Sequence, residues 1–578
     1  MRNLKLEKWI LRRYSSLSNN FKEKTFTFEE AFKFLNNLYQ DSKSQVKVVL
    51  SEINKAGLLK TEKNPKNKRK KIYQLLPLTP PKTNNLTTKD QLISLLKQAA
   101  DIIRTRVDYT FILLLLFYKA YSDKWEKEFE EKKKELIQKG WEEKEAVIEA
   151  ETGPYHTLNF SRDFLWESIR KEPDKISEKF SQAMKELAKS NPDYQDIFSQ
   201  FDFHHFTSNP ENSAILNQLI ELFSKFSFKE ISGDILGDAY EWILKYFAPT
   251  KAKEGEVYTP REVIRLMIEI LDPKPKSSIY DPCFGSGGML IVAYKYIDEK
   301  YGGNMANFLL LYGQEINPKT LALAKMNMLL HNIKNFRFAL GDTLFFPKFK
   351  EENTIQKFDY VIANPPWNQD GYGEADLKKG EYWQERFTYG FATKQSADWM
   401  WIQHMLASTK ENGKVAIVID TGAVSRGGRE KLIRQKVVDE DLIESVILLP
   451  EKLFYNTQAP AVIIVFNKNK PEERKGKILL INASKEFVPG KPQNTLGPEN
   501  IQKIAKIYEE FKEVEGLSKI ITLEEAKEAD YNLSPSRFVI VIEEEKYKDI
   551  REIKIELKGM EKEEKKIKQK IMKILKRI

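Results

Sequence analysis

The chain has 578 residues and a single cysteine, Cys283, which excludes an intrachain disulfide and a zinc site built on several cysteines. Its 94 Lys and Arg against 84 Asp and Glu give a formal charge of +10. This excess is compatible with a polyanionic partner but does not require one. The longest apolar run, residues 111–118, is too short to span a bilayer, and no N-terminal signal is evident. We therefore expect a cytoplasmic protein with no membrane association.

The first 80 residues predict a winged-helix-like unit. Apolar spacing predicts helices over 28–39 and 44–57, and residues 58–77 have the pattern of strand, basic loop and strand. A basic hairpin tip beside two helices suits contacts with DNA phosphates. A solvated loop on a protein-docking unit is the alternative. The residues expected to contact DNA are Lys66, Lys68, Arg69 and Lys70.

A mostly helical domain and an α/β domain are expected to follow. Residues 81–250 carry apolar spacings of three and four, which indicate helices. From 251 to 470, short β-rich runs alternate with helical segments, a pattern typical of a doubly wound, Rossmann-like α/β sheet. The last two runs, 442–450 and 459–467, lie close together in the sequence. We expect them to form an antiparallel pair at one sheet edge.

The C-terminal part of the chain has an irregular mixed region and then a charged helix. Residues 471–545 show no regular pattern, and the helix covers 546–578. Its apolar residues recur at gaps of four and three once Glu564 is allowed in the series. This 3.5-residue period predicts a coiled coil with a partner helix. The apolar seam consists of Ile553, Leu557, Met560, Ile567, Ile571, Ile574 and Ile578.

Three strand ends in the α/β region predict a cofactor site. After the first strand, SIYDPCFGSGG forms a glycine-rich turn before a helix, so the backbone can approach a cofactor and aim N–H groups at it. The glycine order differs from the GxGxxG of dinucleotide enzymes. The second strand ends at Glu315, suited to ribose hydroxyls, and the third at Asp342, suited to an adenine amino group. The turn residues assigned to the cofactor are Asp281, Gly285, Ser286, Gly287 and Gly288.

The sequence FDYVIANPPW predicts the catalytic loop. A hydrophobic strand runs directly into Asn364, Pro365, Pro366 and Trp367, and two prolines at a strand end stop the ladder and stiffen the loop. The Asn364 side-chain oxygen and the Pro365 carbonyl can both accept hydrogen bonds from one amino group. A base amine is a poor nucleophile because its lone pair is delocalised, and two acceptors would localise it. Trp367 offers a face for stacking a flipped base.

Together these motifs resemble those of S-adenosylmethionine-dependent amino-methyltransferases. Residues 255–267, GEVYTPREVIRLM, resemble the cofactor-binding segment that precedes the glycine turn in the γ-ordered DNA class. The resemblance implies that this segment contacts the methionine part of S-adenosylmethionine. The residues concerned are Glu256, Val257, Tyr258, Thr259, Pro260 and Arg261.

Over residues 88–578 the chain resembles the modification (M) subunit of type I restriction-modification enzymes. The resemblance is carried by LLKQAADIIRTRVDYTFILLLLFYKAYSDKWEKE, LFYNTQAPAVIIVFNK and YNLSPSRFV, in addition to the motifs above. It implies methyl transfer from S-adenosylmethionine to adenine N6 in double-stranded DNA, with no metal. It also implies a complex with a specificity subunit and a restriction (helicase-nuclease) subunit. The family usually has Phe where this chain has Trp367, and residues 1–80 lie outside the resemblance.

Two alternatives remain open from the residues alone. An NPP motif also serves methylation of cytosine N4, of RNA bases and of protein glutamine amines. The other alternative is a non-catalytic, DNA-binding scaffold with a degenerate methyltransferase fold. The intact Asn364, Gly285 and Glu315 argue against a scaffold. No GxxxxGK[ST] sequence occurs, so ATP-driven translocation is not encoded here.

Overall fold

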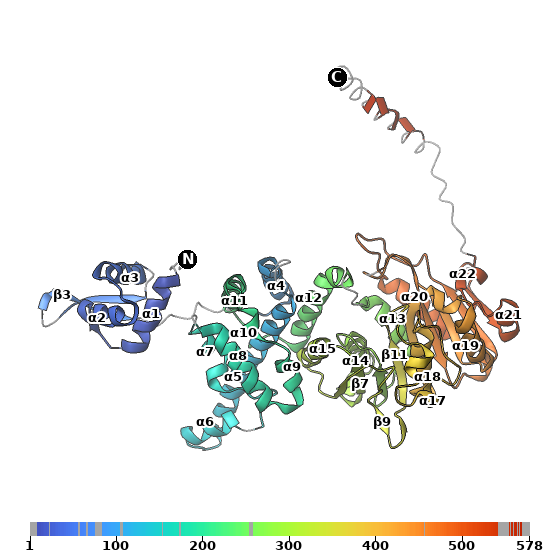
Figure 1. Cartoon of the computed structure of the whole chain (residues 1–578), viewed down its shortest axis with the longest axis horizontal. Coiled ribbons are helices and arrows are strands. Elements are labelled where there is room, and N and C mark those ends of the chain that lie inside the picture. The colour runs from blue at the N-terminus through green and yellow to red at the C-terminus, as the bar shows by residue number, and fades with distance from the viewer. Residues whose placement is uncertain are drawn as a thin grey trace.

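The computed structural model describes most of the chain (Figure 1). The described residues are 8–21, 24–55, 58–64, 67–75, 84–103, 108–152, 154–172, 175–253, 258–455, 457–540 and ten positions between 554 and 568. Several residues assigned above lie outside this part: Lys66, Glu256, Val257, Ile553, Ile571, Ile574 and Ile578, together with the side chains of Lys68, Arg69 and Lys70. Within the described part, no helix has the length and apolarity needed to cross a membrane.

The N-terminal unit has the expected order of two helices and a hairpin, preceded by a helix and a short strand that were not predicted. Its elements are α1 (Lys8–Phe21), β1 (Phe26–Thr27), α2 (Phe28–Tyr39), α3 (Lys43–Lys55), β2 (Leu59–Asn64) and β3 (Asn67–Leu75). The strands form an antiparallel sheet in the order β1-β3-β2. Thr27 and Glu30 form a capping box that starts α2. A separate hydrophobic core closes the unit, with Leu17, Leu35 and Val49 fully buried.

The expected helical domain is also present. Its longer helices are α4 (Lys89–Ile103), α5 (Thr110–Gln138), α6 (Glu143–Thr152), α8 (Ile176–Ser190), α11 (Pro210–Phe223) and α12 (Gly233–Lys253). Shorter ones are α7 (Trp166–Arg170), α9 (Gln195–Ser199) and α10 (Phe203–Phe206). The apolar run at 111–118 forms the first turns of α5, and residues 112–118 are all buried. The run is therefore part of a core helix.

A nine-stranded sheet forms the α/β domain, which confirms the doubly wound, Rossmann-like prediction. Its order is β16-β15-β13-β14-β12-β11-β6-β7-β8. Five neighbouring strands are parallel: β8 (Phe336–Leu340), β7 (Leu310–Glu315), β6 (Ser278–Asp281), β11 (Phe358–Ala363) and β12 (Thr409–Asp420). One hydrophobic cluster joins the sheet to α13 (Arg261–Leu271), α14 (Gly288–Tyr301) and α20 (Pro498–Glu510). A second cluster joins it to α18 (Asp398–Ala407) and α19 (Gly428–Asp439).

The far side of the sheet differs from the prediction in two respects. β13 (Ile443–Leu448) and β14 (Ala461–Asn467) pair antiparallel as expected, but β14 lies between β13 and β12 rather than at an edge. Residues 471–545, expected to be irregular, contribute β15 (Lys477–Asn482) and β16 (Ser518–Thr522). β15 is parallel to β13 and antiparallel to β16. These pairings join segments far apart in the sequence, so local periodicity does not reveal them.

Helix α15 (Pro318–Leu330) belongs to the α/β domain but is packed into the core of the helical domain. Its buried side chains Leu323, Met326, Leu329 and Leu330 share one hydrophobic cluster with α5, α9 and α12. The hydroxyl of Tyr240 on α12 donates to the Leu323 carbonyl at 2.8 Å. α15 follows directly after the carboxyl end of β7. The helical domain therefore supports the sheet at the edge where the parallel strands end.

Near the C-terminus, each described position between 554 and 568 is helical, as expected. Three seam residues are described, and all are exposed: Leu557 by 50%, Met560 by 60% and Ile567 by 57%. The seam therefore has no partner within the described part of the chain. Its pairing with another helix stays a prediction.

Candidate active site

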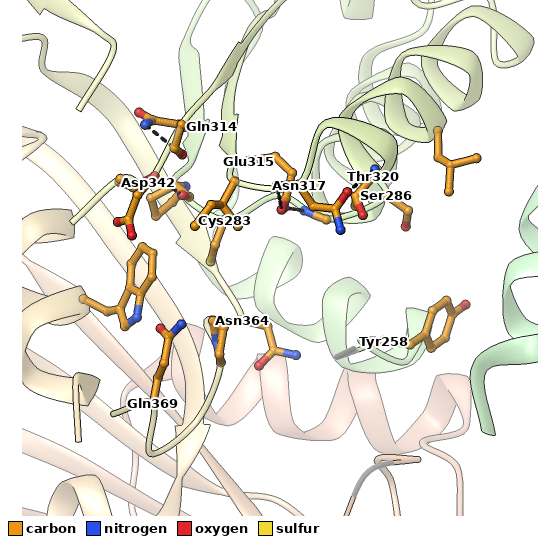
Figure 2. A pocket seen from close by; sticks show the side chains of 18 of the residues that line it. Tyr258, Cys283, Ser286, Gln314, Glu315, Asn317, Thr320, Asp342, Asn364 and Gln369 are labelled. Atoms are coloured by element: carbon orange, nitrogen blue, oxygen red, sulfur yellow. Dashed lines mark hydrogen bonds between the residues drawn. The ribbon is translucent and has the colours of Figure 1, made fainter. Parts of the chain in front are cut away.

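A cavity of about 310 Å³ lies at the carboxyl ends of the parallel strands β6, β7, β8 and β11. In such sheets the carboxyl ends meet at one edge, which is where α/β proteins bind ligands. A smaller hollow of about 50 Å³ shares Tyr258, Cys283, Gly285, Ser286 and Asn364 with it. Figure 2 shows Gln314 and Asp342 at one end of the cavity, Tyr258 at the other, and Asn364 between Tyr258 and Gln369.

The glycine turn forms one wall of both spaces. Gly285 and Gly287 have φ angles of +55° and +79°, which favour glycine. A Cβ atom added to Gly285 would meet no heavy atom within 4 Å, so the turn faces open space. A Cβ atom on Gly288 would lie 2.2 Å from Nη1 of Arg261, so this position accommodates the Arg261 side chain. Arg261 forms an ion pair with Glu241 of α12.

Glu315 is fixed against this turn. Its Oε2 atom accepts a hydrogen bond from the Gly285 N–H at 3.1 Å, and its Oε1 atom accepts from the Asn317 N–H at 2.9 Å. Asn317 in turn caps the first turn of α15 by accepting from the N–H groups of Lys319 and Thr320. The carboxylate at the end of β7 is therefore held at the cavity wall by two backbone donors.

Asp342 lies at the end of the cavity away from Tyr258 (Figure 2). Its Oδ1 atom accepts from the Leu344 N–H at 3.0 Å, and its Oδ2 atom accepts from the Tyr372 hydroxyl at 2.9 Å. Tyr372, Gln369 and Trp401 line the cavity together with Asp342. This end combines a carboxylate, an amide and aromatic faces, which suits a planar ring that carries an amino group.

Asp281 lines the smaller hollow and is 2% exposed. The pKa of its carboxyl is raised to about 8, chiefly by burial and also by the nearby Glu315, while the hydrogen bond from the Cys283 N–H opposes the rise. A buried carboxyl that no cation stabilises favours the protonated form. Arg261 lines the same hollow but is paired with Glu241. A cationic group placed in this hollow would restore the carboxylate.

Asn364 lines both the cavity and the hollow, and its side-chain amide is fixed from both sides. The Nδ2 atom donates to Oγ1 of Thr259 at 2.8 Å, and the Oδ1 atom accepts from Nε1 of Trp367 at 2.8 Å. An indole N–H can only donate. The amide oxygen therefore faces Trp367, and one of its two lone pairs remains for another donor.

The loop after the two prolines is anchored at Asn368. This residue has a φ of +52°, and its N–H donates to Oδ1 of the buried Asp398 at 2.9 Å. Arg426 pairs with Asp398 and also with Asp420, at 3.1 Å, and Glu430, at 2.6 Å. A network from α18, β12 and α19 thus holds the end of the NPPW loop.

The structure brings most of the assigned residues to these two spaces. Those that line them are Tyr258, Thr259, Arg261, Asp281, Gly285, Ser286, Gly288, Glu315, Asp342, Asn364 and Pro366. Four others lie beside the site without lining it. Pro260 and Gly287 cap α13 and α14. Pro365 is buried, and Trp367 packs edge-on against Phe454 at 5.0 Å.

Other lining residues were not predicted. Tyr109, Leu244 and Ala248 come from the helical domain, where apolar periodicity indicates only a core face. Gln369 and Tyr372 follow the NPPW motif closely enough that their position in the same loop was a usable signal. Within the described residues, no group of three or more His, Cys, Asp or Glu side chains could hold a metal ion.

Comparison with known proteins gives consistent matches. The N-6 DNA Methylase family matches residues 231–547, and the HsdM N-terminal domain matches residues 92–223. The Type I restriction enzyme MjaVIII methylase subunit of Methanocaldococcus jannaschii is 44% identical over 96% of both chains. The MjaVII methylase subunit of the same organism is 42% identical over 97% of this chain and 96% of its own.

One solved structure extends the similarity to the fold. It is the type I restriction-modification system methyltransferase subunit from Streptococcus thermophilus, which is 28% identical with a TM-score of 0.69. The match covers 78% of this chain and 99% of that one.

Proposed function

Since the chain belongs to the N-6 DNA methylase family as a type I restriction enzyme methylase subunit, we propose specific roles for the residues around its cavity. It is an S-adenosylmethionine-dependent adenine methyltransferase. Our proposal is that Asn364 and Pro365 hold the amino group of the target adenine. The walls formed by the glycine turn, Glu315 and Asp342 hold the cofactor beside it.

The chemistry of the cavity walls fits S-adenosylmethionine. Asp342 with Trp401 and Tyr372 suits the adenine ring, and Glu315 suits the ribose hydroxyls. The buried Asp281 suits the ammonium of the methionine part, because a cation would stabilise its carboxylate. The cofactor supplies a methyl group on a sulfonium, which requires no metal.

Asn364 supports the catalytic assignment most directly. It reaches both the larger cavity and the hollow at Asp281, and its amide oxygen keeps a free lone pair. An acceptor there and the Pro365 carbonyl would hold one amino group toward tetrahedral geometry. This localises the N6 lone pair and directs it toward the methyl group. Acceptors fixed in place before the reaction need no reorganisation during it.

For Trp367 we propose an orienting role. Its indole N–H fixes the Asn364 amide, and its ring packs on Phe454. That Trp367 stacks a flipped base stays a prediction. Its ring is not among the residues that line the cavity. Tyr258 is an aromatic residue that lines both spaces together with Asn364.

The proposal includes the assembly in which the chain acts. A specificity subunit would supply the DNA sequence to be modified, and a restriction subunit would supply cleavage. The exposed seam of Leu557, Met560 and Ile567 is the proposed contact with helices of the specificity subunit. We place this complex in the cytoplasm, where chromosomal DNA and S-adenosylmethionine meet.

The decisive test replaces Asn364 by Ala. Methyl transfer to duplex DNA by the reconstituted complex should fall by at least ~100-fold, the order expected when a transition-state acceptor is removed. Cofactor affinity, measured by calorimetry, should change only a few-fold. Asn353→Ala, at an exposed position in the turn between β9 (Lys350–Glu351) and β10 (Thr354–Ile355), is the matched control. A near wild-type rate in Asn364→Ala would contradict the assignment.

A further inference from the structure

The net positive charge of the chain is concentrated in the N-terminal unit. Residues 1–75 contain 18 Lys and Arg against seven Asp and Glu, an excess of 11. The whole chain carries +10, so the remaining residues together carry −1. A domain that carries the whole positive excess of its protein has the electrostatic footprint of a nucleic-acid-binding module.

Helix α3 presents to solvent a polar face with two lysines, Lys47 and Lys55, of which Lys55 pairs with Glu52 at 2.6 Å. Its opposite face is buried in the core of the unit through Val46, Val49 and Ile53. The exposed stripe follows the helical repeat and consists of Ser44, Lys47, Val48, Ser51 and Lys55. Val48 is the one apolar side chain in this stripe and is 46% exposed.

This face suits a DNA groove better than a protein partner. α3 is the second helix of a two-helix pair followed by a hairpin, and in helix-turn-helix folds that helix enters the major groove. Short polar groups and a valine can contact base edges and thymine methyls. Protein interfaces rely on aromatic anchors in their centre, and the described exposed stripe of α3 contains none.

The hairpin β2–β3 provides an independent observation. Lys63 and Lys71 stand directly opposite each other in its register, and both are exposed. Like charges in directly opposed positions destabilise an isolated hairpin. Neither lysine has a carboxylate partner among the residues that the structure describes. A phosphate backbone along this edge would neutralise both.

We propose that the N-terminal unit binds double-stranded DNA on its own, with α3 in the major groove and the hairpin at Lys63 and Lys71 on the adjacent backbone. This surface is separate from the cavity that holds the target base. It gives the chain an affinity for duplex DNA that does not depend on a specificity subunit.

One experiment compares two insertions of the same charge into the unit. Val48→Glu places a carboxylate on the α3 stripe, and Leu38→Glu does so on α2, where Leu38 is 53% exposed. Binding of the full chain to a fluorescein-labelled duplex of mixed sequence is measured by anisotropy. Val48→Glu should weaken binding by at least ~10-fold relative to Leu38→Glu, because like charges brought together at an interface are strongly unfavourable. Equal weakening by both would overturn the proposal.

A second experiment removes positive charge without adding a carboxylate. Lys47, Lys63 and Lys71 are replaced together by Ala, and the matched control replaces the exposed Lys33, Lys185 and Lys189. The first variant should flatten the salt dependence of binding by about 0.9 log units for each phosphate that the protein no longer neutralises, and the control should not. An unchanged slope would overturn the proposal, and so would a triple variant that binds DNA normally but no longer associates with a specificity subunit.

In both experiments the unfolding transition of the N-terminal unit serves as the folding check, because that unit has its own core. Cofactor affinity should stay unchanged, since none of these residues lines the cavity. It also separates this proposal from the catalytic one. Loss of duplex binding with normal cofactor affinity concerns the N-terminal unit alone, whereas failure of the Asn364 test concerns the active site.

Discussion

At the scale of single residues, two hydrogen bonds fix the side-chain amide of Asn364. Thr259 receives its N–H, and Trp367 donates to its oxygen. A phenylalanine at this position would have no donor. This chain therefore has an orienting hydrogen bond that a phenylalanine could not form.

We predict that Trp367→Phe lowers the rate of methyl transfer by about 2- to 10-fold. One hydrogen bond contributes roughly 0.5–1.5 kcal/mol, and 1.36 kcal/mol corresponds to a tenfold rate change. Single-turnover methylation should show the loss in the rate constant, with cofactor affinity unchanged. Trp141→Phe, at a 44% exposed position of the helical domain, is the control. A rate equal to wild type would show that Thr259 alone orients the amide.

The buried Asp281 makes cofactor binding a proton-linked event. Its pKa of about 8, raised by burial, keeps the carboxyl largely protonated at pH 7. We predict that S-adenosylhomocysteine, which carries the same ammonium, releases close to one proton as it binds near pH 7. Calorimetry in buffers of different ionisation enthalpy measures this number. Asp281→Asn should abolish the release, and a release that persists in this variant would assign the proton to another group.

Asp281 also links stability to pH in the absence of the cofactor. Its folded-state pKa lies above the value of 3.8 for an unperturbed carboxyl, so its contribution to stability is complete below pH 4. That contribution is lost as the pH rises toward 8. Between pH 5 and 8, Asp281→Asn should therefore lose less thermal stability than wild type. Unfolding curves at the two pH values test this, and equal losses would contradict it.

At the scale of elements, the sequence predicted the helices and strands that depend on neighbouring residues. It missed the elements and contacts that depend on residues far apart in the chain. The helix at 28–39 and the strands that end at Asp281, Glu315 and Ala363 follow from periodicity and turn chemistry. The helical wall of the cavity did not follow, because Tyr109 and α12 approach it only through tertiary packing. β15 and β16 were missed for the same reason.

The candidate site likewise contains residues that the sequence identified and residues that it missed. Motif residues at strand ends were identified because the carboxyl edge of a parallel sheet brings them together. Trp401 belongs to an apolar helix, and its sequence pattern cannot separate a core residue from a cavity wall. The Trp367 hydrogen bond depends on a side-chain rotamer, which no sequence pattern specifies.

The C-terminal seam supports a prediction about assembly. Replacing the exposed Leu557, Met560 and Ile567 by Lys should abolish co-purification with the specificity subunit, because each buried aliphatic side chain contributes roughly 1.5–3 kcal/mol. Cofactor binding should be intact. The matched control replaces the exposed Glu561, Lys562 and Lys565 by Ala. Retained association in the seam variant would assign the contact to another surface.

At the scale of the whole molecule, the described domains are separated in two ways: one boundary divides no hydrophobic core, and the other crosses a shared core. The N-terminal unit closes its own core. The helical and α/β domains share a core, because α15 of the α/β domain completes the helical core. Its contributing side chains are Leu323, Met326, Leu329 and Leu330. The ion pair between Arg261 and Glu241 joins the same two domains beside the glycine turn.

We predict two unfolding transitions in scanning calorimetry of the full chain. One belongs to the N-terminal unit, and the larger one to the helical and α/β domains together. S-adenosylhomocysteine at 100 times its dissociation constant should stabilise only the larger, by about 2.7 kcal/mol. Three transitions, or a ligand-induced shift of both, would show that the domains are coupled differently.

The position of α15 has a consequence for how such chains can evolve. A recombination point after Leu75 divides no hydrophobic cluster of the described residues, so the N-terminal unit can be gained, lost or exchanged between genes without repacking its neighbours. A recombination point between α12 and α15 would leave four large apolar side chains without the surface that buries them. The helical and α/β domains must therefore be inherited as one piece, while the DNA-contacting unit in front of them is free to diversify.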